Sequence, residues 1–251
     1  MLKIIISPAK KMILWDEDPC KLTTPVFWRE AGYLLKLLKG KSLSQLQALW
    51  QCSERLALEN YELLHQAELS CNLTPALLAY KGIQYQYMAP AVFSEVQWRY
   101  VQQRLRILSG FYGILTPTDG VVPYRLEMQA RLNTASFKGL YDYWGDSLYE
   151  ELVKGGTTDI VNLASAEYSR AVLPYLSSKI RCVTCVFGEM VKGKIKVKAT
   201  QAKMARGEMV RWMAENQITS PQELCSFHSL DYCFHPELSG KDTFVFLKEP
   251  S

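Results

Sequence analysis

RLRILSGFYGILTPTDGVVPYRLEM, residues 104–128, is the stretch that organises the chain. Its first residues alternate charged and apolar side chains up to Ser109 and a glycine, which predicts a short strand ending in a turn. Further glycines and prolines predict a long, ordered loop, the kind of segment on which functional sites usually lie. The loop begins after Arg106 and ends with Arg125 and Glu127. An arginine on each side of the turn suits an anionic oxygen, because the guanidinium fork matches phosphate geometry.

Two other stretches predict strands of a buried sheet. Residues 2–6 and residues 159–163 are short and almost unbroken apolar runs, which is typical of strands covered on both faces. In open α/β sheets ligands gather at the carboxyl ends of the strands, so the polar residues there are candidate site residues. They are Ser7 and Lys10 after the first run, and Asn162, Ser165 and Glu167 at the end of the second. Capping of the next helix would explain Ser165 and Glu167 equally well.

Apolar spacing and turn residues predict helices and strands along the whole chain. Helices are expected at residues 26–38, 42–50, 53–69, 76–80, 94–104 and 147–153 and from about residue 201, with Ser42 and Ser53 as caps. Two hairpins are expected, one from residues 180–189 and 194–199 and one from residues 230–234 and 243–247. We therefore predict an α/β (α+β) fold, a single domain over residues 1–251 in which helices flank a central mixed β-sheet.

Basic residues recur at predicted turns and on one predicted helix. Lys81 and Gly82 lie between two helices, and a helix-hairpin-helix element of this kind can direct backbone N–H groups at a phosphate. A plain turn between helices would have the same sequence. Lys203 and Arg206 are three residues apart and hence lie on one side of a helix. The lysines of residues 194–198 share one face of a strand, either as a solvated, aggregation-resistant edge or as a binding surface.

Composition limits the class of protein. The chain has 251 residues, 48% of them hydrophobic, a net charge of +4 and a pI of about 8.6, which permits nucleic-acid binding without requiring it. Seven cysteines without a pairing pattern, and an N-terminus without the apolar region of a signal peptide, indicate reduced thiols and a cytoplasmic protein. No apolar run approaches the roughly 18 residues that would span a bilayer, so no membrane association is expected.

Cysteine and histidine residues do not form a familiar metal pattern. Cys182 and Cys185 have the CxxC spacing but fall in a predicted strand, where residues three apart point to opposite faces. Four metal-capable side chains lie close together near the C-terminus, with a spacing that matches no common zinc site and leaves metal binding open: Cys225, His228, Cys233 and His235. We expect no metal and no cofactor. The P-loop, GxGxxG, HExxH and GxSxG motifs of common enzyme classes do not occur in the sequence.

The chain resembles the YaaA family of bacterial peroxide stress proteins over essentially its whole length. The motifs that carry the resemblance are SPAK at residues 7–10, YKG at 80–82, residues 106–113 with Pro117, PYRLEM at 123–128, YWGD at 143–146, residues 162–168, and Ala202, Lys203, Ala205, Arg206 and Gly207. The resemblance implies a cytosolic α/β protein with a positively charged cleft and a helix-hairpin-helix element linked to the binding of duplex DNA. It also implies protection against hydrogen peroxide, associated with lower intracellular iron and less Fenton chemistry on DNA.

These features support three hypotheses. The first is a protein that binds nucleic acid, with double-stranded DNA as its partner, through cationic side chains that converge on one cleft. The second is an enzyme that acts on a phosphate-bearing nucleotide or a nucleobase, in which Glu127 or Glu167 transfers protons. The third treats the pairing of Arg125 with Glu127 as structural. A monomer is expected. The predicted anion-binding residues are Ser7, Lys10, Lys81, Gly82, Arg106, Ser109, Arg125, Asn162, Ser165, Lys203 and Arg206.

Overall fold

Strand β1 (Leu2–Ile6) lies in the middle of the main sheet, as its apolar run predicts. The structure is a computed structural model that describes residues 1–15 and 21–249. In these residues the sheet has the strand order β11-β12-β9-β8-β1-β5-β6, and β10 pairs with β9 beside this path. The other strands of the sheet are β5 (Leu105–Ser109), β6 (Gly113–Leu115), β8 (Asp159–Leu163), β9 (Arg181–Val191), β10 (Lys194–Lys196), β11 (Tyr232–Phe234) and β12 (Thr243–Lys248).

Three neighbouring strands end at the same edge of the sheet. Strand β1 is parallel to β5 and to β8, with Ile6 opposite both Ile107 and Leu163. The segments that follow these strands therefore begin side by side. Strand β5 then turns at Gly110 and returns as the antiparallel β6, so part of the predicted loop is a strand. Short strands also pair β2 (Lys11–Met12) with β4 (Tyr80–Lys81) and β3 (Thr74–Pro75) with β7 (Gly120–Val121).

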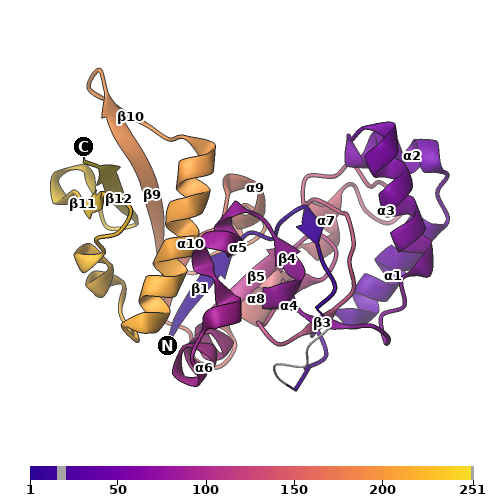
Figure 1. Cartoon of the computed structure of the whole chain (residues 1–251), viewed down its shortest axis with the longest axis horizontal. Helices are drawn as coiled ribbons and strands as arrows, with labels where there is room; N and C mark the ends of the chain where they lie inside the picture. The colour runs from indigo at the N-terminus through magenta and orange to yellow at the C-terminus, as the bar shows by residue number, and fades with distance from the viewer. Residues whose placement is uncertain (16–20, 250–251) are drawn as a thin grey trace.

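Helices flank the sheet, and the predicted mixed α/β architecture is confirmed. Helix α6 (Glu95–Arg104) packs on β1, α10 (Ala199–Glu215) on β9 and α8 (Ser147–Val153) on β6. Figure 1 shows α10, α5 and α6 in front of the sheet, and α1 to α3 together at the opposite end from β10 to β12. The remaining helices are α1 (Trp28–Lys39), α2 (Leu43–Trp50), α3 (Glu54–Gln66), α4 (Ala76–Ala79), α5 (Ile83–Met88), α7 (Leu140–Trp144) and α9 (Ala166–Ser169).

Local signals mark most of the helix boundaries. Ser42 forms a capping box with Gln45 at the start of α2, as predicted. Ser53 occupies the N-cap position of α3, as predicted, but its side chain makes no cap hydrogen bond. The short helix after Ser220 is a 3₁₀ helix, Pro221–Ser226. No helix within residues 1–15 and 21–249 has both the length and the apolar character that crossing a membrane requires.

The segment predicted as a helix-hairpin-helix has short helices on both sides of the Lys81–Gly82 pair. Helix α4 has four residues and α5 has six. Between them, β4 pairs with β2, so the backbone at Lys81 already bonds to another segment of the chain. The element thus places Lys81 and Gly82 at a fixed position. Its role in binding DNA stays a prediction.

Glycines allow three close backbone approaches. A Cβ on Gly207 of α10 would overlap the carbonyl oxygen of Gln84 in α5, so the two helices touch through their backbones. A Cβ on Gly110 would lie 2.5 Å from the carbonyl oxygen of Leu126, and one on Gly82 would lie 2.9 Å from the Cβ of Ala9. Only glycine fits such positions, since it has no Cβ. These contacts join α10 to α5, the β5 turn to residues 126–128, and the start of α5 to the loop after β1.

We predict that Gly207→Ala lowers the free energy of unfolding by about 3 kcal/mol, because the added methyl group can fit only if α5 and α10 separate. Gly240→Ala is the matched control, since a Cβ at Gly240 meets nothing within 4 Å. Urea denaturation of both variants measures the difference. Equal midpoints for the two variants would contradict the close contact.

Candidate anion-binding site

A cavity of about 370 Å³ opens at the carboxyl edge of β1 and β8. Strand β5 lies on one side of β1, and β8, which comes later in the chain, lies on the other side. In open α/β sheets ligands bind at such a switch in strand order. Ten of the predicted site residues, which come from separate segments of the chain, line the cavity: Ser7, Lys10, Lys81, Gly82, Arg125, Glu127, Ser165, Glu167, Lys203 and Arg206.

The loops after β1 and β8 hold each other at the base of the cavity. The hydroxyl of Ser7 accepts a hydrogen bond from the backbone N–H of Ser165 at 2.8 Å and donates to the hydroxyl of Ser165 at 3.2 Å. The hydroxyl of Tyr85 donates to the backbone carbonyl of Ser7 at 3.0 Å. Ser165 precedes α9, as predicted, but its side chain makes no cap hydrogen bond. It contacts the neighbouring loop instead.

Four exposed lysines surround the mouth of the cavity, and we call them the rim lysines: Lys10, Lys11, Lys81 and Lys203. The pairing of β2 with β4 places Lys11 directly opposite Lys81. Lys203 is carried by α10. Sequence reasoning missed Lys11, although the Lys10–Lys11 pair was visible as a signal.

Two buried arginines lie deeper in the same cavity, and we call Arg125 and Arg206 the inner arginines. The Arg125 side chain is only 10% exposed, and its Nη2 lies 3.4 Å from the Trp50 carbonyl oxygen. Burial lowers the pKa of Arg206. Among the described residues no carboxylate forms an ion pair with Arg206. Its charge is therefore available to a ligand.

Glu127 lies between two cations. Its Oε1 is 3.2 Å from the Lys10 ammonium and 3.4 Å from Nη2 of Arg125. The Lys10 side chain is 67% exposed, whereas Arg125 and Glu127 are 10% and 11% exposed. The contact with Arg125 is the pair that the structural hypothesis expected. It leaves the rim lysines and Arg206 unexplained, so pairing alone does not account for the cavity.

Glu167 is a second carboxylate in a different environment. Burial raises its pKa, the backbone N–H of Gln129 donates to it at 3.3 Å and opposes that shift, and nearby Glu127 adds to the rise. A carboxyl group of this kind holds its proton at higher pH than an exposed one.

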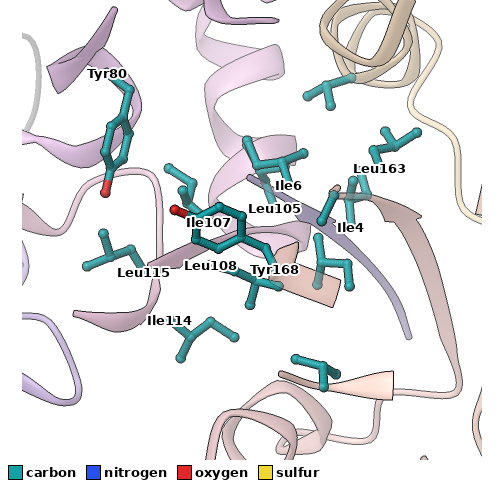
Figure 2. Packing of buried hydrophobic residues seen from close by; sticks show 14 of the residues in the cluster. Ile4, Ile6, Tyr80, Leu105, Ile107, Leu108, Ile114, Leu115, Leu163 and Tyr168 are labelled. Carbon is teal, nitrogen blue, oxygen red and sulfur yellow. The ribbon is translucent and has the colours of Figure 1, made fainter. Parts of the chain in front are cut away.

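Buried tyrosines form one wall of the cavity and were not predicted. The hydroxyl of Tyr124 lies 2.6 Å from the Ser109 hydroxyl and 2.8 Å from that of Tyr80. Burial raises the pKa of Tyr124 to about 12 and also raises those of Tyr85 and Tyr168. Figure 2 shows Tyr80 and Tyr168 beside the aliphatic side chains of β5 and β6, with both hydroxyl groups on the same side of the cluster. These phenols stay protonated near neutral pH, and that of Tyr85 already donates to the Ser7 carbonyl.

Several buried polar atoms of this cavity make no hydrogen bond, although one of them, Glu127 Oε1, lies within ion-pair distance of Lys10 and Arg125. Among the described residues eight buried side-chain nitrogen and oxygen atoms lack a hydrogen bond, and half of them belong to residues that line the cavity: Gln84 Nε2, Arg125 Nε, Glu127 Oε1 and Arg206 Nε. Buried polar groups are nearly always hydrogen-bonded in folded proteins. Three of these four atoms are donors, which fits a ligand rich in acceptor oxygens.

Three predicted residues lie outside the cavity. Arg106 is the clearest error: it lines a separate hollow of about 260 Å³ that also contains Asp119 and Glu151. Its position opposite Ile5 explains this, because Arg106 sits inside the sheet, before the strand end. Ser109 and Asn162 instead hold the turns in place. Ser109 Oγ accepts from two backbone N–H groups, and Asn162 bonds to the Thr184 hydroxyl and the Ala164 N–H.

The cysteine and histidine residues are dispersed. Cys182 and Cys185 are both buried in β9, within the strand that the sequence predicts. Cys233 Sγ lies 2.9 Å from Nδ1 of His228, whereas His235 pairs with Glu237. In the part of the chain that the structure describes, no group of three or more His, Cys, Asp or Glu side chains is placed to hold a metal ion.

Known proteins resemble this chain along its length. The family model for the peroxide stress protein YaaA matches residues 2–238. The chain belongs to this family. A protein of Pediococcus pentosaceus, named UPF0246 protein, is 50% identical over 248 residues, which is 98% of each chain. Proteins of the same name from Lactiplantibacillus plantarum and Lachnoclostridium phytofermentans are each 48% identical, over 98% and 100% of this chain and 99% and 98% of theirs. The resemblance that the sequence motifs indicated is confirmed.

We predict that sulfate binds the cavity more tightly as the pH falls from neutral toward the raised pKa of Glu167. Protonation removes one negative charge from the cavity, and a charge of this kind changes the affinity by about fivefold. Glu167→Gln should bind sulfate with the low-pH affinity at every pH. Titration calorimetry from pH 5 to 8 measures this, because the charge of sulfate stays constant over that range.

Glu68→Gln is the control for this titration, since Glu68 is exposed and outside the cavity. It should keep the wild-type pH dependence. A Glu167→Gln variant with an unchanged pH profile would show that another group controls the binding.

Proposed function

We propose that this peroxide stress protein binds double-stranded DNA by its phosphates at the mouth of the cavity, and thereby limits oxidative, iron-dependent DNA damage. The observation that carries the proposal is the convergence of the rim lysines and inner arginines on one opening. Six basic side chains meet only two carboxylates there, so the opening is positively charged. A charged opening of this kind suits a phosphate backbone, whose binding is largely electrostatic.

The size of the cavity determines how DNA would lie. A volume of about 370 Å³ is far too small for a duplex, whose major groove alone is about 12 Å wide. The duplex would therefore lie across the mouth, where Lys10 and Lys203 extend exposed side chains. Arg125 and Arg206 lie deeper and can meet only a phosphate group or a single nucleotide unit. Contacts of this kind position a protein on DNA without reading its sequence.

Phosphate binding gives a physical link to peroxide. A protein that neutralises phosphates displaces the cations bound to them. Ferrous ion is one such cation, and the hydroxyl radicals it forms from hydrogen peroxide react close to where they arise. Lysines that replace iron along the backbone move this chemistry away from the DNA. The proposal needs no iron site in the protein.

A second function, catalysis on a phosphate-bearing nucleotide or a nucleobase, is favoured by the two carboxylates. Glu127 contacts Arg125 inside the cavity, and Glu167 has a raised pKa. A carboxylate that faces an arginine and a carboxyl group with a raised pKa suit the roles of base and acid in general acid and base catalysis. The inner arginines would hold the phosphate while Glu167 supplies a proton.

We predict that the variant Lys10→Gln/Lys81→Gln/Lys203→Gln binds a 20-base-pair duplex more weakly and with less salt dependence than the wild type. Each phosphate contact contributes roughly 0.9 to the slope of log K against log salt, so three lost contacts reduce the slope by about 2 to 3. Fluorescence anisotropy of a labelled duplex at several salt concentrations measures both quantities.

The matched control is Arg29→Gln/Lys36→Gln/Lys41→Gln, which removes the same charge around α1. An equal loss of slope in this control would show that net charge alone acts, against the proposed site. As a second readout, wild-type protein should slow the nicking of plasmid DNA by ferrous ion and peroxide. The rim variant should slow it less.

If the protein is an enzyme, as in the second function, we predict that it turns over a nucleotide substrate. Wild-type protein incubated with nucleoside 5′-monophosphates would release base or phosphate, and Glu127→Gln would reduce the rate by at least about 100-fold, the usual contribution of a general base. Chromatography of the mixture detects the products. Steep, salt-dependent DNA binding without any product would reject catalysis and leave the binding proposal in place.

A further inference from the structure

The β9–β10 hairpin projects beyond the sheet. Strand β9 has 11 residues and pairs with β8 as far as Thr184 and with β12 as far as Gly188, so its last three residues extend past both neighbours. The two-residue turn at Lys192 and Gly193 has φ angles of +50° and +74°, which a tight hairpin requires. Every residue from 191 to 200 is exposed. Figure 1 shows this hairpin extending past the neighbouring elements at the β10 label.

The hairpin points to the same side of the molecule as the cavity. Strand β9 is parallel to β8, and the cavity lies at the carboxyl end of β8. Val191 is three residues past Gly188, the last residue of β9 that pairs with β12, so at about 3.3 Å per residue the arm rises on the order of 10 Å beyond the paired part of the sheet. The chain then returns directly into α10, which carries Lys203 to the rim and Arg206 into the cavity. Arm and cavity are therefore joined by one short segment.

The two faces of the hairpin differ in chemistry. Cross-strand pairing places Lys194 opposite Val191, and Lys196 opposite Glu189, on one face. On the other face Ile195 pairs with Met190, and these side chains are 37% and 46% exposed. A ribbon with a cationic face and an exposed apolar face is unusual on the surface of a protein.

Most of the positive charge of the arm is uncompensated. Lys198 pairs with Glu189 at 2.8 Å. Among residues 1–15 and 21–249 no carboxylate forms an ion pair with Lys192, Lys194 or Lys196. Lysines on an edge strand also protect against aggregation. Protection alone does not explain why Ile195 and Met190 are left exposed beside them.

We propose that the β9–β10 hairpin is a ribbon arm that enters a groove of double-stranded DNA while the rim lysines hold phosphates nearby. The major groove admits a two-stranded ribbon. Lys192, Lys194 and Lys196 contact the phosphates that border the groove, and Ile195 with Met190 faces the thymine methyl groups on its floor. The inference rests on the proposed function, because it extends the same DNA surface beyond the cavity.

The test compares the salt dependence of duplex binding in arm variants and controls. Lys192→Gln/Lys194→Gln/Lys196→Gln should lower the slope of log K against log salt by about 2 to 3. Ile195→Ser should weaken binding several-fold at an unchanged slope, because it removes an apolar contact and no charge. All four positions are exposed, so the fold is retained. The α1 control variant should keep the wild-type slope.

The possible results distinguish the proposal for the arm from the proposal for the cavity. Loss of slope in the arm variant and in the rim variant supports both proposals. An unchanged slope in the arm variant overturns the arm, while a rim effect would keep the cavity proposal. A wild type that shows no salt-dependent binding overturns both. If the arm variant changes only the oligomeric state in sedimentation, the hairpin is a contact between copies of this chain and the proposal is wrong.

Discussion

Backbone contact between α10 and α5 at Gly207 is the constraint on which the cavity depends. Gln84 and Arg206 line the cavity on either side of this contact, so the gap between them is set by two backbones that meet without an intervening side chain. The contact at Gly110 acts in the same way on the segment that carries Arg125 and Glu127. Backbone contacts are stiffer than contacts between flexible side chains. Charged groups held this way keep their spacing before any ligand arrives, which lowers the entropy cost of binding.

Much of this arrangement follows from local sequence. The apolar runs at β1 and β8 predict parallel, buried strands, and parallel strands end together. The parallel pairing of β1 with β8 brings Ser7 and Ser165 into contact although they are 158 residues apart in the sequence. Lys203 and Arg206 reach the same place because helical spacing puts both on one side of α10. The site could be predicted wherever a strand end or a helix face fixes the direction of a side chain.

Long-range packing limits what the sequence predicts. The sequence predicts Arg106 in the cleft because an arginine on each side of the turn suits an anionic oxygen, but its register opposite Ile5 directs it to the hollow with Asp119. The tyrosine wall depends on Tyr80 and Tyr124, which are 44 residues apart and meet only through the pairing of short segments. The exposed apolar pair on the β9–β10 hairpin is equally invisible before the strand is known to extend past the sheet. In each case the missing information is a register or a strand length, which propensity does not contain.

Unpaired buried groups normally destabilise a protein, and folded chains contain few of them. Here half of those among the described residues gather around one cavity that also has an excess of positive charge. This loss of stability is consistent with a site shaped for a ligand, since functional sites are where residues depart from the arrangement that would be most stable. The surrounding lysines destabilise the folded protein much less, because exposed charges stay hydrated and interact weakly until a polyanion approaches. The exposed lysines therefore attract a phosphate backbone from a distance, and the more buried arginines contact the single phosphate group that enters the cavity.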